Sequence, residues 1–154
     1  MRRFWHAVAL LGLATSPLAG QRPITVTGVQ TLGFGTLLPG VPATVARTDP
    51  VNSGQFTITG PHGTQAQLTF TLPSVMTGPA GATLPLVFGG GDAGYSQTQN
   101  IGSQVGFDPT QPFVVAFSQQ GRGSVFLGGT ARPGPGQRAG TYAGTITLNV
   151  ATFP

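Results

Sequence analysis

The chain has 154 residues, including 25 glycines, 14 prolines and no cysteine, and its seven basic and three acidic side chains give a formal net charge of +4. The length suits one compact domain, and the absence of cysteine excludes disulfides, thiol catalysis and thiolate metal sites. The five arginines after residue 20 lie apart along the sequence, so we expect no nucleic-acid partner, because phosphate backbones are bound by clustered cations.

The first twenty residues have the three-part pattern of a secretory signal peptide. The MRR start is positively charged, residues 7–14 are apolar, and residues 16–20 are mostly small. We expect cleavage after Gly20 and export to the periplasm, the cell surface or the medium. The alternative is an uncleaved membrane anchor, although the apolar stretch is much shorter than the roughly 20 residues that cross a bilayer.

Residues 21–154 are expected to form a single all-β domain. Glycine and proline recur between short runs of alternating apolar and polar residues, which is typical of a sandwich or barrel. The runs span residues 24–29, 32–37, 44–47, 55–59, 66–72, 84–88, 113–118, 124–130 and 141–150. They predict an antiparallel β-sandwich of about seven to nine strands, with loops at residues 76–83 and 89–112.

Three of these runs show which side chains should face the core. Successive side chains of a strand point to opposite faces, so the apolar members of an alternating run lie together. The threonine and glutamine residues between them should then face solvent. The predicted core-facing set is Phe56, Ile58, Leu68, Phe70, Leu72, Tyr142, Ile146, Leu148 and Val150.

The predicted loop at residues 89–112 holds the candidate contact residues Asp92 and Tyr95. Tyr95 is the one aromatic residue that we expect to be exposed in this loop. The GGGDAG run at residues 89–94 matches a dinucleotide fingerprint in spelling, but no amphipathic helix follows to bind a pyrophosphate. A weak calcium site at Asp92 is an alternative, although calcium needs several oxygen ligands. We expect no cofactor.

No combination of residues predicts catalysis or a metal centre. His62 is the only histidine after residue 20 and lies at a predicted hairpin tip, without a second histidine, cysteine or glutamate to share a metal. Asp49 and Asp108 each precede a proline, where aspartate commonly accepts hydrogen bonds from turn amides. No nucleophile-elbow sequence is present. We therefore expect a protein that is not an enzyme.

Six short motifs occur in order along the chain: ITVT at 24–27, LGFG at 32–35, FTITG at 56–60, LP at 72–73, LGGT at 127–130 and AGTYAGT at 139–145. They resemble those of a bacterial family of secreted β-sandwich domains of unknown function. That family carries an early Leu-Asp-Phe-Gly element and a closing Ala-Gly-Thr-Tyr-Ser-Gly-Thr element. The closing strand also resembles that of spore coat protein U-type pilins from archaic chaperone-usher systems. The resemblance implies an immunoglobulin-like, pilin-like sandwich with an assembly role.

On this resemblance, residues 21–30 have two interpretations. Ile24, Val26 and Gly28 alternate on one face and form a candidate donor strand that would fill a groove in the next subunit. The alternative is an ordinary first strand that pairs within its own domain. We expect a secreted structural or adhesive cell-surface subunit that self-associates or binds a periplasmic chaperone. A monomeric periplasmic or surface binding module for a glycan or a partner protein is the alternative function.

Overall fold

The computed structural model describes residues 22–153, which are built mainly from antiparallel β-strands. They form twelve strands, two short 3-10 turns, η1 (Pro79–Gly81) and η2 (Ile101–Ser103), and no α-helix. No helix in this part of the chain could span a membrane. The prediction of an all-β fold is therefore confirmed, whereas the predicted signal peptide lies outside the described residues.

The largest sheet has five strands, and the first strand of the chain forms one of its edges. Val26 lies opposite Ile58, and Phe56 lies opposite Val125 on the next strand. Opposed residues share a face, so the apolar positions of these strands point to the same side. The strand order is β1 (Thr25–Gln30), β3 (Gly54–Thr59), β10 (Arg122–Leu127), β7 (Ala93–Ser96) and β8 (Val105–Phe107).

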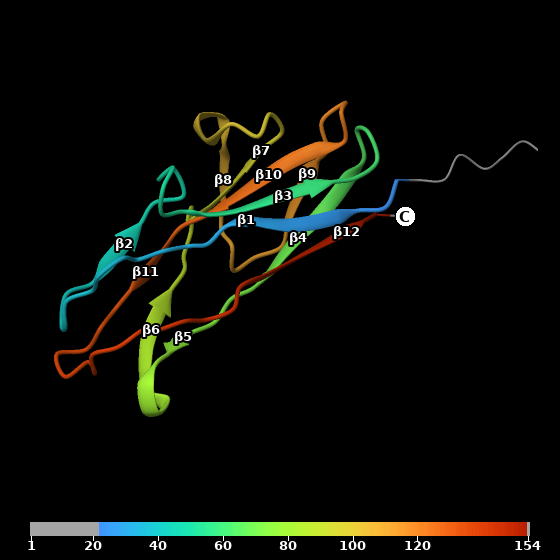
Figure 1. Cartoon of the computed structure of the whole chain (residues 1–154). Helices are drawn as coiled ribbons and strands as arrows, with labels where there is room; N and C mark the ends of the chain where they lie inside the picture. The colour runs from blue at the N-terminus through green and yellow to red at the C-terminus, as the bar shows by residue number, and fades with distance from the viewer. Residues whose placement is uncertain (1–21, 154) are drawn as a thin grey trace, which may run out of the picture.

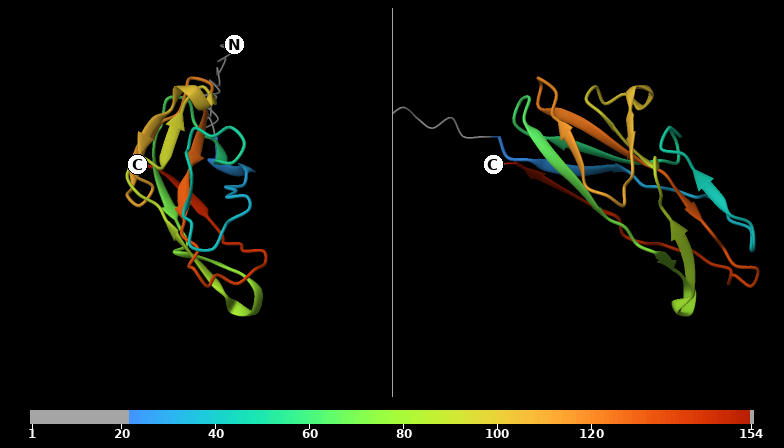
Figure 2. Two further views of the ribbon diagram at one scale, coloured as in Figure 1. Left: turned by 90° about the vertical axis from the view of Figure 1, so that its left-hand side faces the viewer. Right: turned by 180° about the vertical axis from the view of Figure 1, so that it is seen from behind.

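A three-stranded sheet packs against the inner face of the five-stranded sheet (Figures 1 and 2). Its order is β12 (Thr147–Thr152), β4 (Gln65–Thr71) and β9 (Phe113–Ala116). The core between the sheets is one cluster, to which the larger sheet contributes Ile58 and Val125 and the smaller sheet Leu68, Val115 and Leu148. The domain therefore contains two antiparallel sheets around a shared apolar core.

A four-stranded sheet continues the domain beyond one end of this core (Figure 1). The chain enters it directly, because Gly128 alone separates β10 from the strand that follows. A second, smaller core lies here, with Leu84, Leu86 and Ala131 buried against half-buried neighbours. The strand order is β2 (Ala43–Val45), β11 (Gly129–Ala131), β6 (Thr83–Val87) and β5 (Val75–Thr77).

The predicted core residues are inside, but not all are fully buried. Ile58 and Leu68 have no exposed surface, whereas Phe56 and Phe70 are half-buried. Phe56 lies opposite Gly28, which has no side chain to cover its ring. The Phe56 and Phe70 rings meet edge to face, with centroids 5.9 Å apart. The core is therefore closed in its middle and incomplete towards β1.

The prediction of a loop over residues 89–112 was wrong, because this segment contains β7 and β8. Gly94 and Gly106 face each other in this strand pair. A Cβ atom at either glycine would overlap the Arg47 side chain, which lies across the pair. Glycine here makes room for a neighbouring side chain and does not mark a turn.

The alternating pattern predicted some strands to be longer than they are, and it predicted too few strands in total. Residues 32–37 form no strand, and the predicted run at 141–150 is a strand only from Thr147 onward. The run at 124–130 is divided at Gly128, and residues 76–77 of a predicted loop belong to β5. The expected seven to nine strands were too few. A strand needs a neighbour to pair with, and alternation alone does not supply one.

The turn that precedes β3 should make the fold sensitive to acid. Asp49 accepts hydrogen bonds from the Asn52 side chain and from the backbone N–H groups of Val51 and Asn52, at 2.8–3.0 Å. The Asn52 side chain first, and then these amides, hold the pKa of Asp49 below its ordinary value. The stability gained is fully present above the ordinary pKa and is lost as the pH falls through the lowered one.

We therefore expect the melting temperature to fall on going from pH 6 to pH 3, and the fall to be smaller in Asp49→Ala. The variant should already melt lower than the wild type at pH 6. Thermal unfolding followed by circular dichroism at the two pH values measures both differences. An equal acid-induced drop in the two proteins would show that Asp49 does not contribute to acid sensitivity.

Candidate functional site

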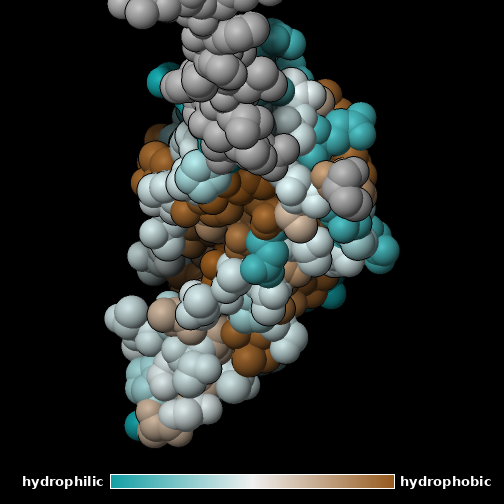
Figure 3. Space-filling model, turned by 90° about the vertical axis from the view of Figure 1, so that its right-hand side faces the viewer, coloured by the Kyte–Doolittle hydropathy of each residue, from teal (hydrophilic) through white to brown (hydrophobic). Residues whose placement is uncertain are grey.

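The sandwich is open along the side where β1 and β12 run, which we call the open seam. Each of these strands pairs with a neighbour on one edge only, so their other edges are free. They contact each other near the chain termini, and the segments that continue them diverge (Figure 1). Core-facing side chains remain accessible here, since Val26 is 38 % exposed and Val150 is half-buried. Figure 3, which views the molecule from the right-hand side of Figure 1, shows hydrophobic surface within a hollow.

The opposite side of the sandwich, along β8 and β9, is partly covered by side chains. Phe107 at the end of β8 stacks on Phe113 at the start of β9, with ring centroids 4.3 Å apart. At the other end of β9, the Tyr95 hydroxyl and the Gln97 amide both donate to the Ala116 carbonyl at 2.8 Å. A cavity of about 410 Å³ lies along the rest of this edge. The two sides thus differ because aromatic rings bridge the edge strands β8 and β9, whereas β1 and β12 carry no aromatic residue.

A narrow cavity of about 280 Å³ lies within the open seam. The stretch that runs from the end of β1 forms one wall, and residues just before β12 form the other. Gly28 contributes to this cavity, and a Cβ atom added there would have no atom within 4 Å. The glycine thus leaves space above the core. The apolar lining residues are Val29, Leu32, Phe56, Leu127 and Ile146.

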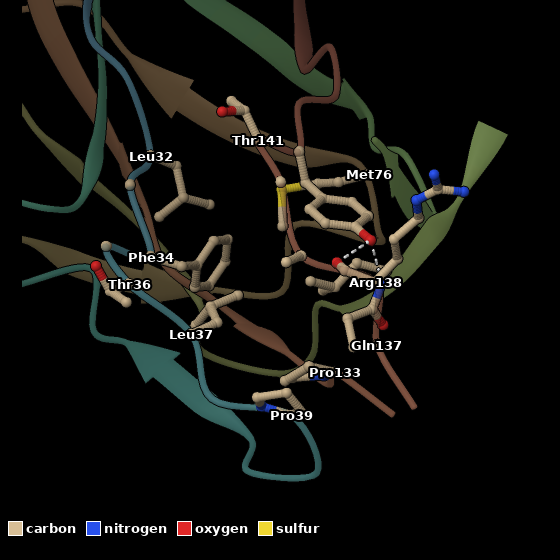
Figure 4. A pocket seen from close by; sticks show the side chains of 16 residues that line it. Leu32, Phe34, Thr36, Leu37, Pro39, Met76, Pro133, Gln137, Arg138 and Thr141 are labelled. Carbon is tan, nitrogen blue, oxygen red and sulfur yellow. Dashed lines mark hydrogen bonds between the residues drawn. The ribbon is translucent and has the colours of Figure 1, made fainter. Parts of the chain in front are cut away.

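A wide cavity of about 590 Å³ continues from the narrow one, with Leu32 shared between them (Figure 4). Phe34, Leu37 and Met76 form much of its wall, and these side chains are only half-buried members of the second core. Gln137 and Arg138 lie at one edge in Figure 4. The second core therefore borders an unfilled space on one side.

The backbone that flanks the wide cavity has few partners among the described residues. In residues 139–146, only Ala143 forms backbone–backbone hydrogen bonds, two with Thr77 at 2.8 and 3.0 Å. In residues 32–37, the only such bond is from the Gly33 N–H to the Asn52 carbonyl, at 2.9 Å. Unpaired N–H and C=O groups along an apolar groove suit the binding of an extended peptide.

Tyr142 fixes the corner at which the chain turns towards β12. Its hydroxyl donates to the Arg138 carbonyl at 2.7 Å and accepts from the Gln137 side-chain amide at 2.7 Å. Its ring packs on Gly78, where a Cβ atom would overlap it. The tyrosine therefore holds the wall of the wide cavity by its ring and its hydroxyl together.

The candidate donor residues Ile24, Val26 and Gly28 lie along the open seam. In the single chain they are part of, or directly precede, β1, which pairs with β3 of the same molecule. All residues of β1 except Gln30 are exposed, and its ladder has an irregularity between Gly28 and Gln30. β1 is thus an edge strand with little buried surface.

The candidate contact residues Asp92 and Tyr95 do not form an exposed contact loop. Tyr95 lies on β7 and is buried, and burial raises its pKa to about 12. Asp92 accepts a hydrogen bond from the Gly89 N–H at 2.9 Å and so closes its own turn. The expectation of an exposed Tyr95 was wrong, because the strand alternation continues through the glycine-rich segment and turns its ring inward.

The described residues contain no group of three metal-ligating side chains. His62 lies at the tip between β3 and β4, where its Nδ1 atom is 2.7 Å from the Gln119 carbonyl oxygen. Asp108 accepts hydrogen bonds from the N–H and hydroxyl of Thr110, which lower its pKa. All three aspartates therefore serve turns of the fold.

Sequence patterns did not indicate the cavities of the open seam. Tyr142 was expected in the core on alternation, Phe34 in a strand over residues 32–37 and Met76 in a loop, but their convergence from three distant segments had no signal in their spacing. No protein-family model, curated protein or solved structure matches the chain. The open seam is therefore the feature from which a function can be argued.

Proposed function

We propose that this protein is a secreted structural or adhesive subunit of the cell surface that assembles by β-strand addition at the open seam. The observation that carries the proposal is a groove lined by polar and apolar residues, which lies beside two free strand edges and next to backbone groups without partners. A strand added there would gain main-chain hydrogen bonds and cover half-buried side chains such as Phe56. Both gains favour association over exposure to water.

We further propose an immunoglobulin-like, pilin-like arrangement for the sandwich. In such folds, a tyrosine before a late strand commonly bonds through its hydroxyl to the backbone a few residues upstream. Tyr142 bonds in this way to the carbonyl of Arg138, four residues earlier. The motif resemblance at residues 139–145, which includes this tyrosine, supports the same assignment.

In the proposed assembly, the strand donor is the segment of Ile24, Val26 and Gly28 from a second copy. β1 is suited to this role because it is terminal, mostly exposed and paired on one side only. β12 is also terminal, but it buries Leu148 in the main core and pairs along its full length with β4. A periplasmic chaperone would cover the seam before subunits meet.

Replacement of Gly28 by isoleucine is expected to prevent assembly while the fold is retained. A Cβ atom added at Gly28 has no atom within 4 Å, and the φ angle of Gly28 is not positive. Since Gly28 lines the narrow cavity, the longer side chain should reduce the space within it. Size-exclusion chromatography and negative-stain microscopy of the protein from Gln21 onward should show fibres or ladders for the wild type. The Gly28→Ile protein should be a monomer with an unchanged circular dichroism spectrum.

Gly90→Ile is the matched control, because Gly90 also has an open Cβ position and no positive φ, and it does not line either seam cavity. It should assemble like the wild type. A chain that begins at residue 31 should form no fibres, because it lacks the donor strand. Fibres from Gly28→Ile, or a monomeric wild type, would argue against assembly through the seam.

A monomeric periplasmic or surface binding module is the second candidate function. The wide cavity favours it, because about 590 Å³ lies within the roughly 300–1,000 Å³ range of small-molecule sites. The oligomeric state of the purified wild type separates the two candidates. A stable monomer would direct attention from the strand edges to the occupant of this cavity.

A further inference from the structure

We infer that the wide cavity binds a single-chain anionic amphiphile, with its hydrocarbon chain among Phe34, Leu37 and Met76 and its head group at Arg138. This inference does not depend on strand addition, because it uses the side chains that line the wide cavity, whereas strand addition uses the free strand edges, the narrow cavity and the unpaired backbone beside the wide cavity. It is based on the lining of the wide cavity, the charge at its mouth and the open glycine backbone of its wall.

The wall of the wide cavity is suited to a hydrocarbon chain. Its apolar side chains come from the second core, where Leu84 is buried but Phe34, Leu37, Met76 and Tyr142 stay half-buried. Water in contact with these groups is displaced favourably by an apolar occupant. Two polar groups of the wall, the Gln137 side-chain amide and the Tyr142 hydroxyl, are bonded to each other. Thr36, Thr141 and the unpaired backbone beside the cavity are further polar groups, so a hydrocarbon chain would cover the apolar part of the wall.

The mouth of the cavity carries a cation without a neighbouring carboxylate. Arg138 lines the cavity and is exposed, and Figure 4 shows its guanidinium group directed outward from the edge. The chain has only three acidic side chains, and each accepts hydrogen bonds in a turn elsewhere: Asp49, Asp92 and Asp108. No ion pair with Arg138 occurs among the described residues. An anionic head group at the mouth would supply the missing charge.

Charge also discriminates between the possible occupants. A second copy would offer Arg138 little to pair with, because the three carboxylates of the chain, Asp49, Asp92 and Asp108, already accept hydrogen bonds in turns. A neutral apolar ligand would leave the guanidinium without a counterion. An amphiphile with one anionic group matches both parts of the site, because its hydrocarbon chain covers the apolar wall and its charge pairs with Arg138.

The glycines of one wall make the cavity accessible and also provide a way to close it. Gly33 lines the cavity, and a Cβ atom there would have no atom within 4 Å, as at Gly35. The φ angle of Gly33 is not positive, so a larger residue is tolerated by the backbone. Valine at position 33 should therefore enter the cavity without disturbing the fold.

The test is isothermal titration calorimetry of the purified protein with decanoate below its micellar concentration, and with 1-decanol as the neutral analogue. We expect saturable one-to-one binding of decanoate. Gly33→Val should weaken the binding of both ligands at least tenfold. Arg138→Gln should weaken decanoate by about fivefold, the upper range for an exposed ion pair, and leave decanol unchanged.

Gly90→Val and Arg122→Gln are the matched controls, since Gly90 is equally open, Arg122 is equally exposed, and neither lines the cavity. Both should bind decanoate like the wild type, and thermal unfolding should show that all four variants fold. Unsaturable binding, full affinity in Gly33→Val, or an unchanged preference for decanoate in Arg138→Gln would overturn the inference. The assembly state, measured separately, bears on strand addition alone.

Discussion

Gly128→Ala is expected to destabilise the protein by more than about 3 kcal/mol, or to prevent folding, although it adds a single methyl group. A Cβ atom at this position would lie 2.3 Å from the Val45 carbonyl oxygen and 2.7 Å from the Arg47 backbone nitrogen. Real Cβ atoms do not approach so closely, and both neighbours are backbone atoms, which cannot rotate away. Either the β10–β11 segment or the segment around Val45 must shift.

The effect should be large because Gly128 joins two sheets. β10 ends at Leu127 and β11 begins at Gly129, so a shift of the glycine displaces both ladders at once. Urea unfolding followed by circular dichroism measures the loss. Gly89→Ala is the matched control, because a Cβ atom at Gly89 meets nothing within 4 Å, and its stability should change by less than about 1 kcal/mol. Equal stability of the two variants would show that the chain relaxes freely at Gly128.

Leu68→Ala is expected to lower the free energy of unfolding by about 2–5 kcal/mol. Leu68 has no exposed surface and lies in the middle of β4, opposite Val150 on one side and Phe113 on the other. Alanine would leave a cavity between the two sheets that well-paired strands cannot close. Since small domains are stable by only about 5–15 kcal/mol, this is a large share of the total.

Leu38→Ala is the control for Leu68→Ala, because it makes the same substitution at an exposed position. The difference between the two variants is the effect of burial. Leu38 is 64 % exposed, so the same substitution should cost less than about 1 kcal/mol. The urea midpoints of the two variants, at equal slopes, give the comparison directly. A cost for Leu68→Ala no larger than that of Leu38→Ala would mean that the sheets do not share the tight core described here.

Alternation predicted β3 and β4, which have partners on both edges, but it missed β7, which also lies inside its sheet between β10 and β8. Residues 55–59 and 66–72 match β3 and β4 closely, and Ile58 and Leu68 are buried as expected. These strands lie inside their sheets, so their apolar faces are fixed by the sequence period. The alternating pattern also predicted a strand at residues 32–37, and this prediction was wrong. The segment contains Phe34 and Leu37 and pairs with no neighbouring strand.

Glycine had two different meanings that the sequence could not separate. Around Gly89 and Gly91 it does form a turn, and the Asp92 carboxylate closes this turn. At Gly94 and Gly106 it lies within paired strands under the Arg47 side chain. Arg47 is distant in sequence, so only the folded chain shows why these positions lack a side chain. The misassigned loop at residues 89–112, and with it the exposed Tyr95, followed from this ambiguity.

The all-β class, most of the strand faces and the turn roles of Asp49 and Asp108 could be predicted from residue patterns, because these depend on neighbours within a few residues. Only the folded chain shows that Phe107 and Phe113 bridge the edge strands on one side of the sandwich, while no ring bridges β1 and β12 on the other. The open seam forms where chain segments more than a hundred residues apart approach without pairing. Local periodicity carries no information about such a meeting, since it depends on which edges the rest of the fold leaves free.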